Sequence, residues 1–272
     1  MKKALLTLMA ILSMACKDVP KEAEQLDHQQ IEEVYSLKEF STIDAKNSDA
    51  TAYYLFDTHY TMRGQRSSDP KALDCQVAVY RKVEQLHSDG LRMVFVEGTY
   101  KGVSQLDKIK EQVKNYTRSV PAQYEGTATL FDDDVLVAFI YDTEDQKNVL
   151  AINYAGTLSV VGWERTPDEE LGKEHAVFFE RSKRLEETYK RVQSGEIKEG
   201  SPEYQQYLAN DKQFTADLES NRKRRSLDAY TVSQELGDQV YAVVIGRAHN
   251  EDIINIIASQ ESHPKIVGFV CP

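Results

Sequence analysis

Short apolar runs alternate along the chain with stretches whose apolar residues have helical spacing. Four of the runs, with the polar residues that end them, are Ala52–His59, Leu91–Glu97, Thr157–Glu164 and Tyr241–His249. Their β-branched and aromatic residues predict strands buried on both faces, as in a parallel sheet. The helical stretches include Pro70–Ser88 and Asn250–Ser259, and Lys265–Val270 reads as a last strand. We therefore predict an α/β fold with a mostly parallel sheet and helices on both faces.

The segment from residue 166 to 236 is long, charged and rich in helix-forming residues. It begins with Pro167 and the acidic residues Asp168–Glu170, which suit the first turn of a helix. Glycine and proline between residues 195 and 202 interrupt the helical pattern, which then resumes. We predict a long helical insertion, folded as a hairpin, before the last strand that ends in a histidine. Such a hairpin could cover one edge of the sheet like a lid.

The amino-terminal residues have the pattern of a secretory signal. Met1 and two lysines are followed by an apolar run, Ala4–Leu12, and then by Cys16. The run is too short to span a membrane, which takes roughly 20 apolar residues. A cysteine at the cleavage point resembles a lipobox, so we predict a signal peptide over residues 1–15 and lipidation of Cys16. Ordinary signal cleavage after Ala15 is the alternative. We expect a membrane-anchored lipoprotein of the cell envelope, facing the periplasm or the exterior.

The remaining chain divides by composition. Residues 16–50 are charged and poor in large apolar side chains, which predicts a polar tether. Residues 51–272 are long enough for a single α/β domain. The formal net charge of −11 argues against a nucleic-acid partner, which needs a basic surface. Cys75 and Cys271 either form a disulfide in an oxidising compartment or remain two buried thiols, and the sequence leaves both open.

A histidine or a carboxylate stands at the carboxyl end of each of the four predicted strands. These residues are His59, Glu97, Glu164 and His249. The carboxyl ends of parallel strands share the edge where α/β proteins bind ligands, so we expect the four to converge. Imidazole and carboxylate groups bind Zn, Mn, Fe or Co, and such a metal would lower the pKa of a water and polarise a carbonyl. The alternative for His249 is a packing or capping role at the start of the following helix.

Glu97 has two roles open to it at such a site, as a metal ligand or as the general base that takes a proton from water. Without a metal, a histidine would act as the base and Glu97 would orient it. The chain contains no G-x-S-x-G nucleophile motif. Water is therefore the expected nucleophile if the protein is an enzyme.

Three short motifs follow predicted strands: Gly246-Arg-Ala-His249, Glu97-Gly98 and Gly162-Trp-Glu164. Over about residues 51–272 they resemble the superfamily that includes erythromycin esterases, TraB/Tiki proteases and ChaN-like haem-binding lipoproteins. The motif that ends in His59 departs from the pattern, because Phe56 stands at its glycine position.

The resemblance also implies a functional arginine on the helix before the last motif, and Arg225 is the candidate. A guanidinium there could stabilise an oxyanion or hold a substrate carboxylate. The alternative is that residues 222–225, which are Arg-Lys-Arg-Arg, form a solvated basic face.

Three functions remain open from the sequence. The first is metal-assisted hydrolysis of an ester or amide bond in a small-molecule or peptide substrate. The second is ChaN-like haem or metal binding without catalysis, with a haem ligand from Tyr53, Tyr54, Tyr60 or His59. Tyrosines beside a strand also serve as core residues. The third is a catalytically silent protein that keeps only the fold, which the departure at Phe56 favours.

Overall fold

The computed structural model describes residues 37–57, 70–108 and 146–271. The predictions for Cys16, His59 and Tyr60 lie outside these residues. All the described residues belong to one unit, Tyr35–Pro272.

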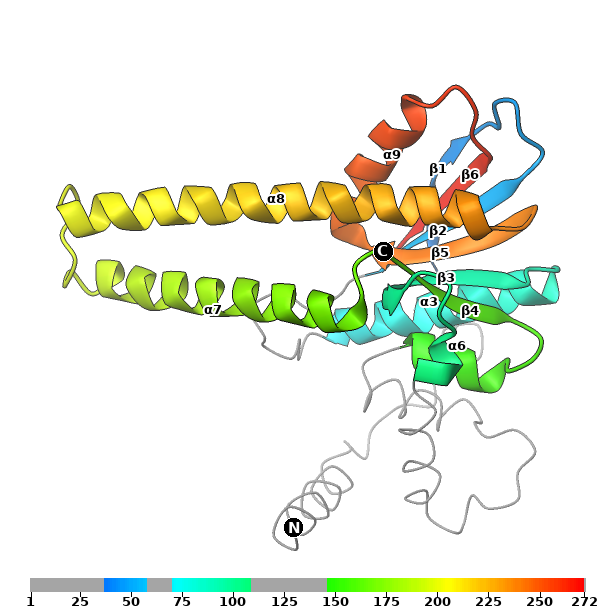
Figure 1. Ribbon diagram of the computed structural model, residues 1–272, viewed down its shortest axis with the longest axis horizontal. Coiled ribbons are helices and arrows are strands. Elements are labelled where there is room, and N and C mark those ends of the chain that lie inside the picture. The colour runs from blue at the N-terminus through cyan, green and yellow to red at the C-terminus, as the bar shows by residue number, and fades with distance from the viewer. Residues whose placement is uncertain (1–36, 58–69, 109–145, 272) are drawn as a thin grey trace, which may run out of the picture. The chain divides into compact units, whose positions relative to one another are not determined.

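A sheet of six strands forms the centre of the described residues (Figure 1). The strands are β1 (Lys38–Ile43), β2 (Thr51–Asp57), β3 (Met93–Tyr100), β4 (Ser159–Glu164), β5 (Val240–Gly246) and β6 (Lys265–Val270). Their order is β1-β6-β2-β5-β3-β4, and every neighbouring pair is parallel except β1 with β6. The predicted α/β class and mostly parallel sheet are confirmed. Strand β5 lies between β2 and β3, so the carboxyl ends of these strands meet at one edge.

Strand β1 falls inside the segment that we assigned to the polar tether, so the sheet begins before residue 51. It is a short edge strand, paired only with β6, and most of its side chains are exposed. Phe40 nevertheless packs edge-on against Phe56, with ring centroids 5.6 Å apart. A Cβ on Gly268 would lie 2.6 Å from the Phe40 ring, so the Phe40 side chain in its present position lies over a residue without a side chain. Ile43 also packs against the apolar cluster of the sheet. An edge strand with few apolar contacts has little compositional signal, so the tether prediction did not reveal it.

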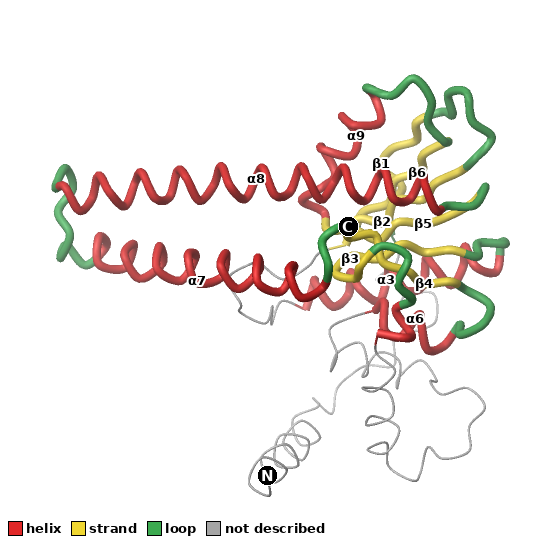
Figure 2. The backbone as a smooth tube through the Cα atoms, viewed as in Figure 1, coloured by secondary structure: helices red, strands yellow, loops and turns green. Residues whose placement is uncertain are grey.

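The described residues also form five helices (Figure 2). They are α3 (Pro70–Ser88), α6 (Gln146–Asn153), α7 (Asp168–Gln193), α8 (Pro202–Leu236) and α9 (Asn250–Ala258). The short 3-10 turn η2 (Arg247–His249) joins β5 to α9. Helices α7 and α8 lie side by side, and Gly195 and Gly200 in the turn between them have left-handed φ angles of +78° and +81°. The hydroxyl of Ser201 caps α8 by accepting from the Tyr204 amide at 3.1 Å.

Successive residues of the central strands contribute to two different hydrophobic clusters, as the alternation of side chains along a strand requires. Leu55 and Val244 belong to a cluster with apolar residues of α3 and α6. Tyr54 and Ile245 belong to another cluster, which includes residues of α8 and α9. This burial on both faces explains why the strands read as continuous apolar runs.

A disulfide joins Cys75 on α3 to Cys271, which directly follows β6, with their Cα atoms 5.4 Å apart. The structure thus selects the paired alternative for these cysteines. The bond links positions 196 residues apart in the sequence, so it ties the beginning of the α/β unit to its end.

Candidate functional site

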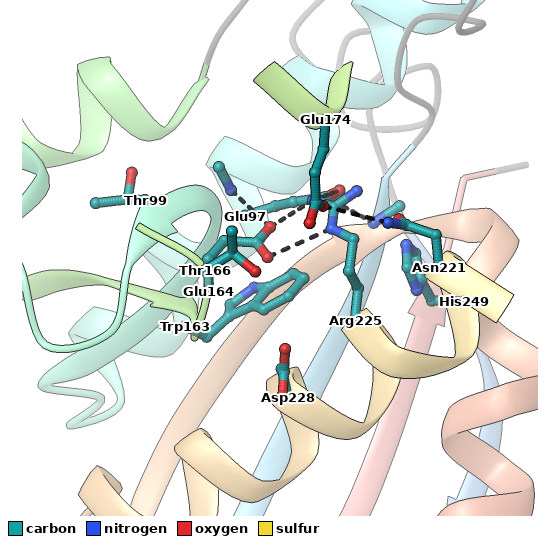
Figure 3. Close-up of polar contacts among 12 residues, drawn as sticks. Glu97, Thr99, Trp163, Glu164, Thr166, Glu174, Asn221, Arg225, Asp228 and His249 are labelled. Carbon is teal, nitrogen blue, oxygen red and sulfur yellow. Dashed lines mark hydrogen bonds and ion pairs between the residues drawn. The ribbon is translucent and has the colours of Figure 1, made fainter. Parts of the chain in front are cut away.

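Two carboxylates and a guanidinium converge at the carboxyl edge of the sheet (Figure 3). Glu97 comes from β3, Glu164 ends β4, and Arg225 reaches them from α8. Arg225 Nη2 donates to Glu97 Oε1 at 2.6 Å and also to Glu164 Oε1, while Nε donates to Glu164 Oε2 at 3.3 Å. We call these three residues the edge cluster.

Backbone amides also donate hydrogen bonds to the two carboxylates. The Gly98 amide donates to Glu164 Oε1 at 3.2 Å, and the Gly246 amide donates to Glu97 Oε2 at 3.1 Å. Lys147 on α6 donates to the Glu97 carbonyl oxygen at 2.9 Å. Both glycines therefore belong to motifs whose backbone holds the edge cluster in place.

Steric contacts explain why the Gly162-Trp-Glu164 motif begins with glycine. A Cβ at residue 162 would lie 2.1 Å from the Thr99 carbonyl oxygen and 2.4 Å from that of Tyr100. The end of β3 therefore crosses β4 at a distance that only glycine allows. This close approach brings Glu97 and Glu164 to the same guanidinium.

The edge cluster is largely removed from water. The side chain of Glu164 is 0% exposed, that of Arg225 6% and that of Glu97 16%. Arg225 also lies over the ring of Trp163, with its Cζ 5.6 Å from the ring centroid. Burial by itself would lower the pKa of Arg225, but the charges of Glu97 and Glu164 outweigh it and raise that pKa above its usual value.

His249 lies in a second polar cluster, next to the edge cluster. Its Nδ1 is 2.8 Å from the hydroxyl of Ser226, the residue after Arg225 on α8. The Ser226 hydroxyl is also 3.3 Å from Asp252 Oδ2 on α9, and Asp252 in turn accepts from Arg222 Nε at 2.8 Å. Ser226, His249 and Asp252 are all buried. We call Arg222, Ser226, His249 and Asp252 the histidine cluster.

The structure thus brings together Glu97, Glu164 and Arg225, three of the predicted site residues. His249 is connected to the edge cluster through the backbone of its own motif. Gly246, the first residue of that motif, donates its amide hydrogen bond to Glu97. His59 and Tyr60 lie outside the described residues. The residues 222–225 do not form a plain solvated face, since Arg222 pairs with Asp252 and Arg225 is buried in the edge cluster.

Sequence reasoning missed Ser226, Asp252 and Trp163. The signal for Ser226 was the row of small residues Ser226, Ala229 and Ser233, whose spacing places them on one helix face. All three are fully buried, as expected where a helix packs closely on a sheet. Asp252 gave a weaker signal, because an acidic residue in the first turn of a helix is common for dipole reasons alone.

The donors seen here fit a metal only in part. His249 fits, because its Nδ1 is already hydrogen-bonded, as is usual for metal-binding histidines. Glu164 does not fit, because it is fully buried and its oxygens bond to Arg225 and to the Gly98 amide. Among the residues that the structure describes, no group of three or more His, Cys, Asp or Glu side chains is arranged to hold a metal. Of the predicted ligands that the structure describes, His249 therefore suits a metal better than Glu164 does.

His175 on α7 titrates near the same cluster. Partial burial lowers its pKa first, and the positive charge of Arg225 lowers it further, against the opposing effect of nearby carboxylates. The pKa of His175 on α7 therefore depends on the charges of the edge cluster.

No helix in the described part of the chain is long and apolar enough to cross a membrane. Comparison with family models, with curated proteins and with solved structures gives no match.

Proposed function

We propose that this protein is an envelope lipoprotein that hydrolyses an ester or amide bond with water as the nucleophile. The observation that supports this most is the convergence of Glu97, Glu164 and Arg225, from three separate elements, at the carboxyl edge of the sheet. Buried ionic groups at this edge are costly to assemble, and they gather where α/β proteins bind ligands. The motif resemblance to erythromycin esterases and TraB/Tiki proteases points in the same direction.

Glu97 is the member of the edge cluster best placed to meet a substrate, because it is the most exposed of the three. Its carboxylate is held by Arg225 and by the Gly246 amide, so its orientation is fixed before any ligand arrives. We assign it the role of orienting the attacking water, and His249 the role of proton acceptor.

Arg225 has a different role from the one the resemblance implies. Its donors are directed at Glu97 and Glu164, and its side chain is nearly excluded from solvent. We therefore assign it to holding Glu97 in place and not to binding an oxyanion or a substrate carboxylate.

The roles assigned to Glu97 and His249 describe the site without a metal. With a divalent metal, His249 would instead be a ligand together with His59 and Glu97, and the metal would lower the pKa of the water and polarise the carbonyl. In this proposal α7 and α8 form the helical insertion before the last motif, and helices cover both faces of the sheet.

Assays with purified protein on aryl esters and on peptide amides, with and without added Zn²⁺ or Mn²⁺, test the function. We expect turnover, and we expect Glu97→Gln and His249→Ala to lower it by about 10²- to 10⁴-fold, the usual effect of losing acid–base catalysis. Glu235→Gln is the matched control, because Glu235 is exposed and pairs with Arg165. No turnover on either class, or equal turnover in Glu97→Gln and wild type, would refute hydrolysis at this site.

Haem binding, the alternative, is separated from hydrolysis by the absorbance of protein mixed with haemin. A Soret band that His249→Ala removes, in a protein without turnover, would replace the hydrolase proposal with a haem carrier. Unchanged haemin absorbance counts against this alternative.

Anchoring at Cys16 is a further part of the proposal, supported by the basic start, the apolar run and the cysteine at the cleavage point. Metabolic labelling with a fatty-acid analogue should mark the wild type and leave Cys16→Ser unlabelled. Equal labelling of the two proteins would exclude lipidation of Cys16.

A further inference from the structure

The buried hydroxyl of Ser226 has three polar neighbours and a single proton to share among them. Its Oγ is 2.9 Å from the Arg222 carbonyl oxygen, 3.3 Å from Asp252 Oδ2 and 2.8 Å from His249 Nδ1. The Arg222 carbonyl can only accept a hydrogen bond. The bond to it is the usual contact of a helical serine with the carbonyl four residues earlier.

The carboxylate of Asp252 also acts only as an acceptor, provided that it is ionised. Arg222 Nε donates to it at 2.8 Å, and this hydrogen bond is the main reason that the pKa of Arg222 is raised. Asp252 also lies in the first turn of α9, where the helix dipole favours negative charge. Both features suit a carboxylate that accepts hydrogen bonds at this position.

If Ser226 donated to His249 Nδ1, its contacts with the Arg222 carbonyl and with Asp252 would have no proton between them. If it donates to one of these two acceptors, His249 Nδ1 can donate to its oxygen, and two hydrogen bonds form instead of one. Burial favours the arrangement with more hydrogen bonds, so we direct the proton of Ser226 to the Arg222 carbonyl or to Asp252. In either case the hydroxyl presents its oxygen, and not its proton, to His249. Because two acceptors cannot form a hydrogen bond with each other, His249 Nδ1 must carry a proton at 2.8 Å from this oxygen. A neutral imidazole with its proton on Nδ1 carries its lone pair on Nε2.

We infer that Ser226 is a positioning residue that fixes neutral His249 as the tautomer protonated on Nδ1. This inference rests on the proposed function in one respect, since it makes Nε2 the atom that accepts a proton or binds a metal there. Asp252 and Arg222 act one step further away by orienting the Ser226 hydroxyl.

A serine, a histidine and an aspartate in contact also resemble a nucleophilic triad, but their arrangement differs. Asp252 contacts the hydroxyl of Ser226, whereas the acid of a triad contacts the histidine and orients it. Ser226 is 0% exposed, so its hydroxyl faces protein on all sides. The geometry assigns Ser226 to positioning and leaves water as the nucleophile.

Nitrogen NMR of histidine measures the tautomer directly. Protein labelled with ¹⁵N in histidine, stripped of metal with a chelator, is observed by two-bond proton–nitrogen correlation at a pH where His249 is neutral. Loss of one set of signals in His249→Ala assigns the spectrum. We expect the His249 proton on Nδ1 in the wild type. A proton on Nε2, or on both nitrogens throughout the titration, would overturn the inference without any variant.

Two serine variants on the same helix separate positioning from packing. Ser226→Ala should move the proton of His249 to Nε2 or leave a mixture of tautomers. Ser233→Ala is the matched control, because Ser233 is also fully buried on α8 but donates to the Tyr230 carbonyl. It should leave the tautomer unchanged. An unchanged tautomer in Ser226→Ala, or an equal change in both variants, would contradict the role of Ser226.

Zinc affinity then connects the tautomer to function. Loss of a partner that orients a metal-binding histidine typically weakens binding by about 10- to 100-fold, and we expect this range for Ser226→Ala. A protein with the Nδ1 tautomer that binds no zinc would refute the metal-site proposal and leave the role of Ser226 standing. A protein that binds zinc but carries the His249 proton on Nε2 would refute the role of Ser226 and leave the metal-site proposal standing.

Discussion

Helix α8 belongs to two regions that use their polar residues in opposite ways (Figure 1). Its outer part, residues 202–221, pairs with α7, and Phe214 is its buried residue. Its inner part, residues 222–236, packs on the sheet and buries Arg225, Ser226, Asp228, Ala229, Tyr230, Val232 and Ser233. One continuous helix thus carries a largely solvated surface and a buried polar site.

In the outer part, α7 and α8 contact each other through partly exposed ion pairs and aromatic side chains. Arg181 on α7 pairs with Asp217 at 2.7 Å, and both side chains are 35% exposed. Aromatic contacts such as that between Phe178 and Phe214, with ring centroids 6.1 Å apart, hold the two helices together. Exposed ion pairs of this kind contribute little, because water and salt screen them.

The inner part shows the cost of a buried site. Arg225 loses its hydration and recovers that free energy only through Glu97 and Glu164. Polar groups in such a place are retained despite their cost, which is the pattern expected where chemistry, and not stability, decides the residue. This contrast supports the proposal that the functional residues lie in the inner part of α8 and not in the outer part.

The largest expected effect comes from removing the guanidinium of the inner part. Arg225→Ala leaves two carboxylates buried without their cation, and we expect it to cost about 3–5 kcal/mol of unfolding free energy. Arg181→Ala in the outer pair should barely move the midpoint of denaturation. Urea unfolding followed by circular dichroism measures both. Similar losses of unfolding free energy in the two variants would contradict the difference that we describe between the inner and outer parts of α8.

A smaller loss of unfolding free energy is expected when one valine in each region, Val232 on inner α8 and Val177 on α7, is replaced by alanine. Val232 on inner α8 is 0% exposed, and Val177 on α7 is 58% exposed. Val232→Ala should cost about 1–3 kcal/mol through lost burial and a residual cavity. Val177→Ala should stay within about 0.5 kcal/mol of the wild type. Equal effects in urea unfolding would mean that the hairpin is packed as tightly as the sheet.

The smallest effect concerns the pH dependence of stability at His175. Its pKa in the folded protein is lowered from the usual value of 6.5, by partial burial first and by Arg225 next, while Glu164, Glu97 and Glu174 oppose the shift. The neutral form is therefore favoured by folding, so its contribution is complete above about pH 6.5 and is lost as the pH falls below that value. We expect His175→Gln to lose less thermal stability than the wild type between pH 7.5 and 5.5. A greater loss in the variant would reverse the sign.

The fold was largely predictable because the central strands are buried on both faces and read as continuous apolar runs. Strand β1 was not, since an edge strand needs few apolar residues. At the site, Glu164 could be predicted from its position at the end of β4, and Arg225 from a motif resemblance. Glu97 was also expected at a strand end, but β3 continues to Tyr100, so Glu97 lies within the strand. Ser226 could not be assigned, because a serine within a helix has the same local sequence pattern whether it faces water or a histidine.

Retention of a metal by the wild type and by His249→Ala tests most directly whether the buried polar groups at the sheet edge form a ligand site. Calorimetric titration of chelator-treated protein with Zn²⁺ should show one tight site in the wild type. Binding should be lost in His249→Ala, which should stay folded by circular dichroism. His263→Ala is the control, because His263 is also buried but bonds to the Pro264 carbonyl; it should bind zinc as the wild type does. Equal zinc binding by the wild type and a folded His249→Ala protein would contradict the account.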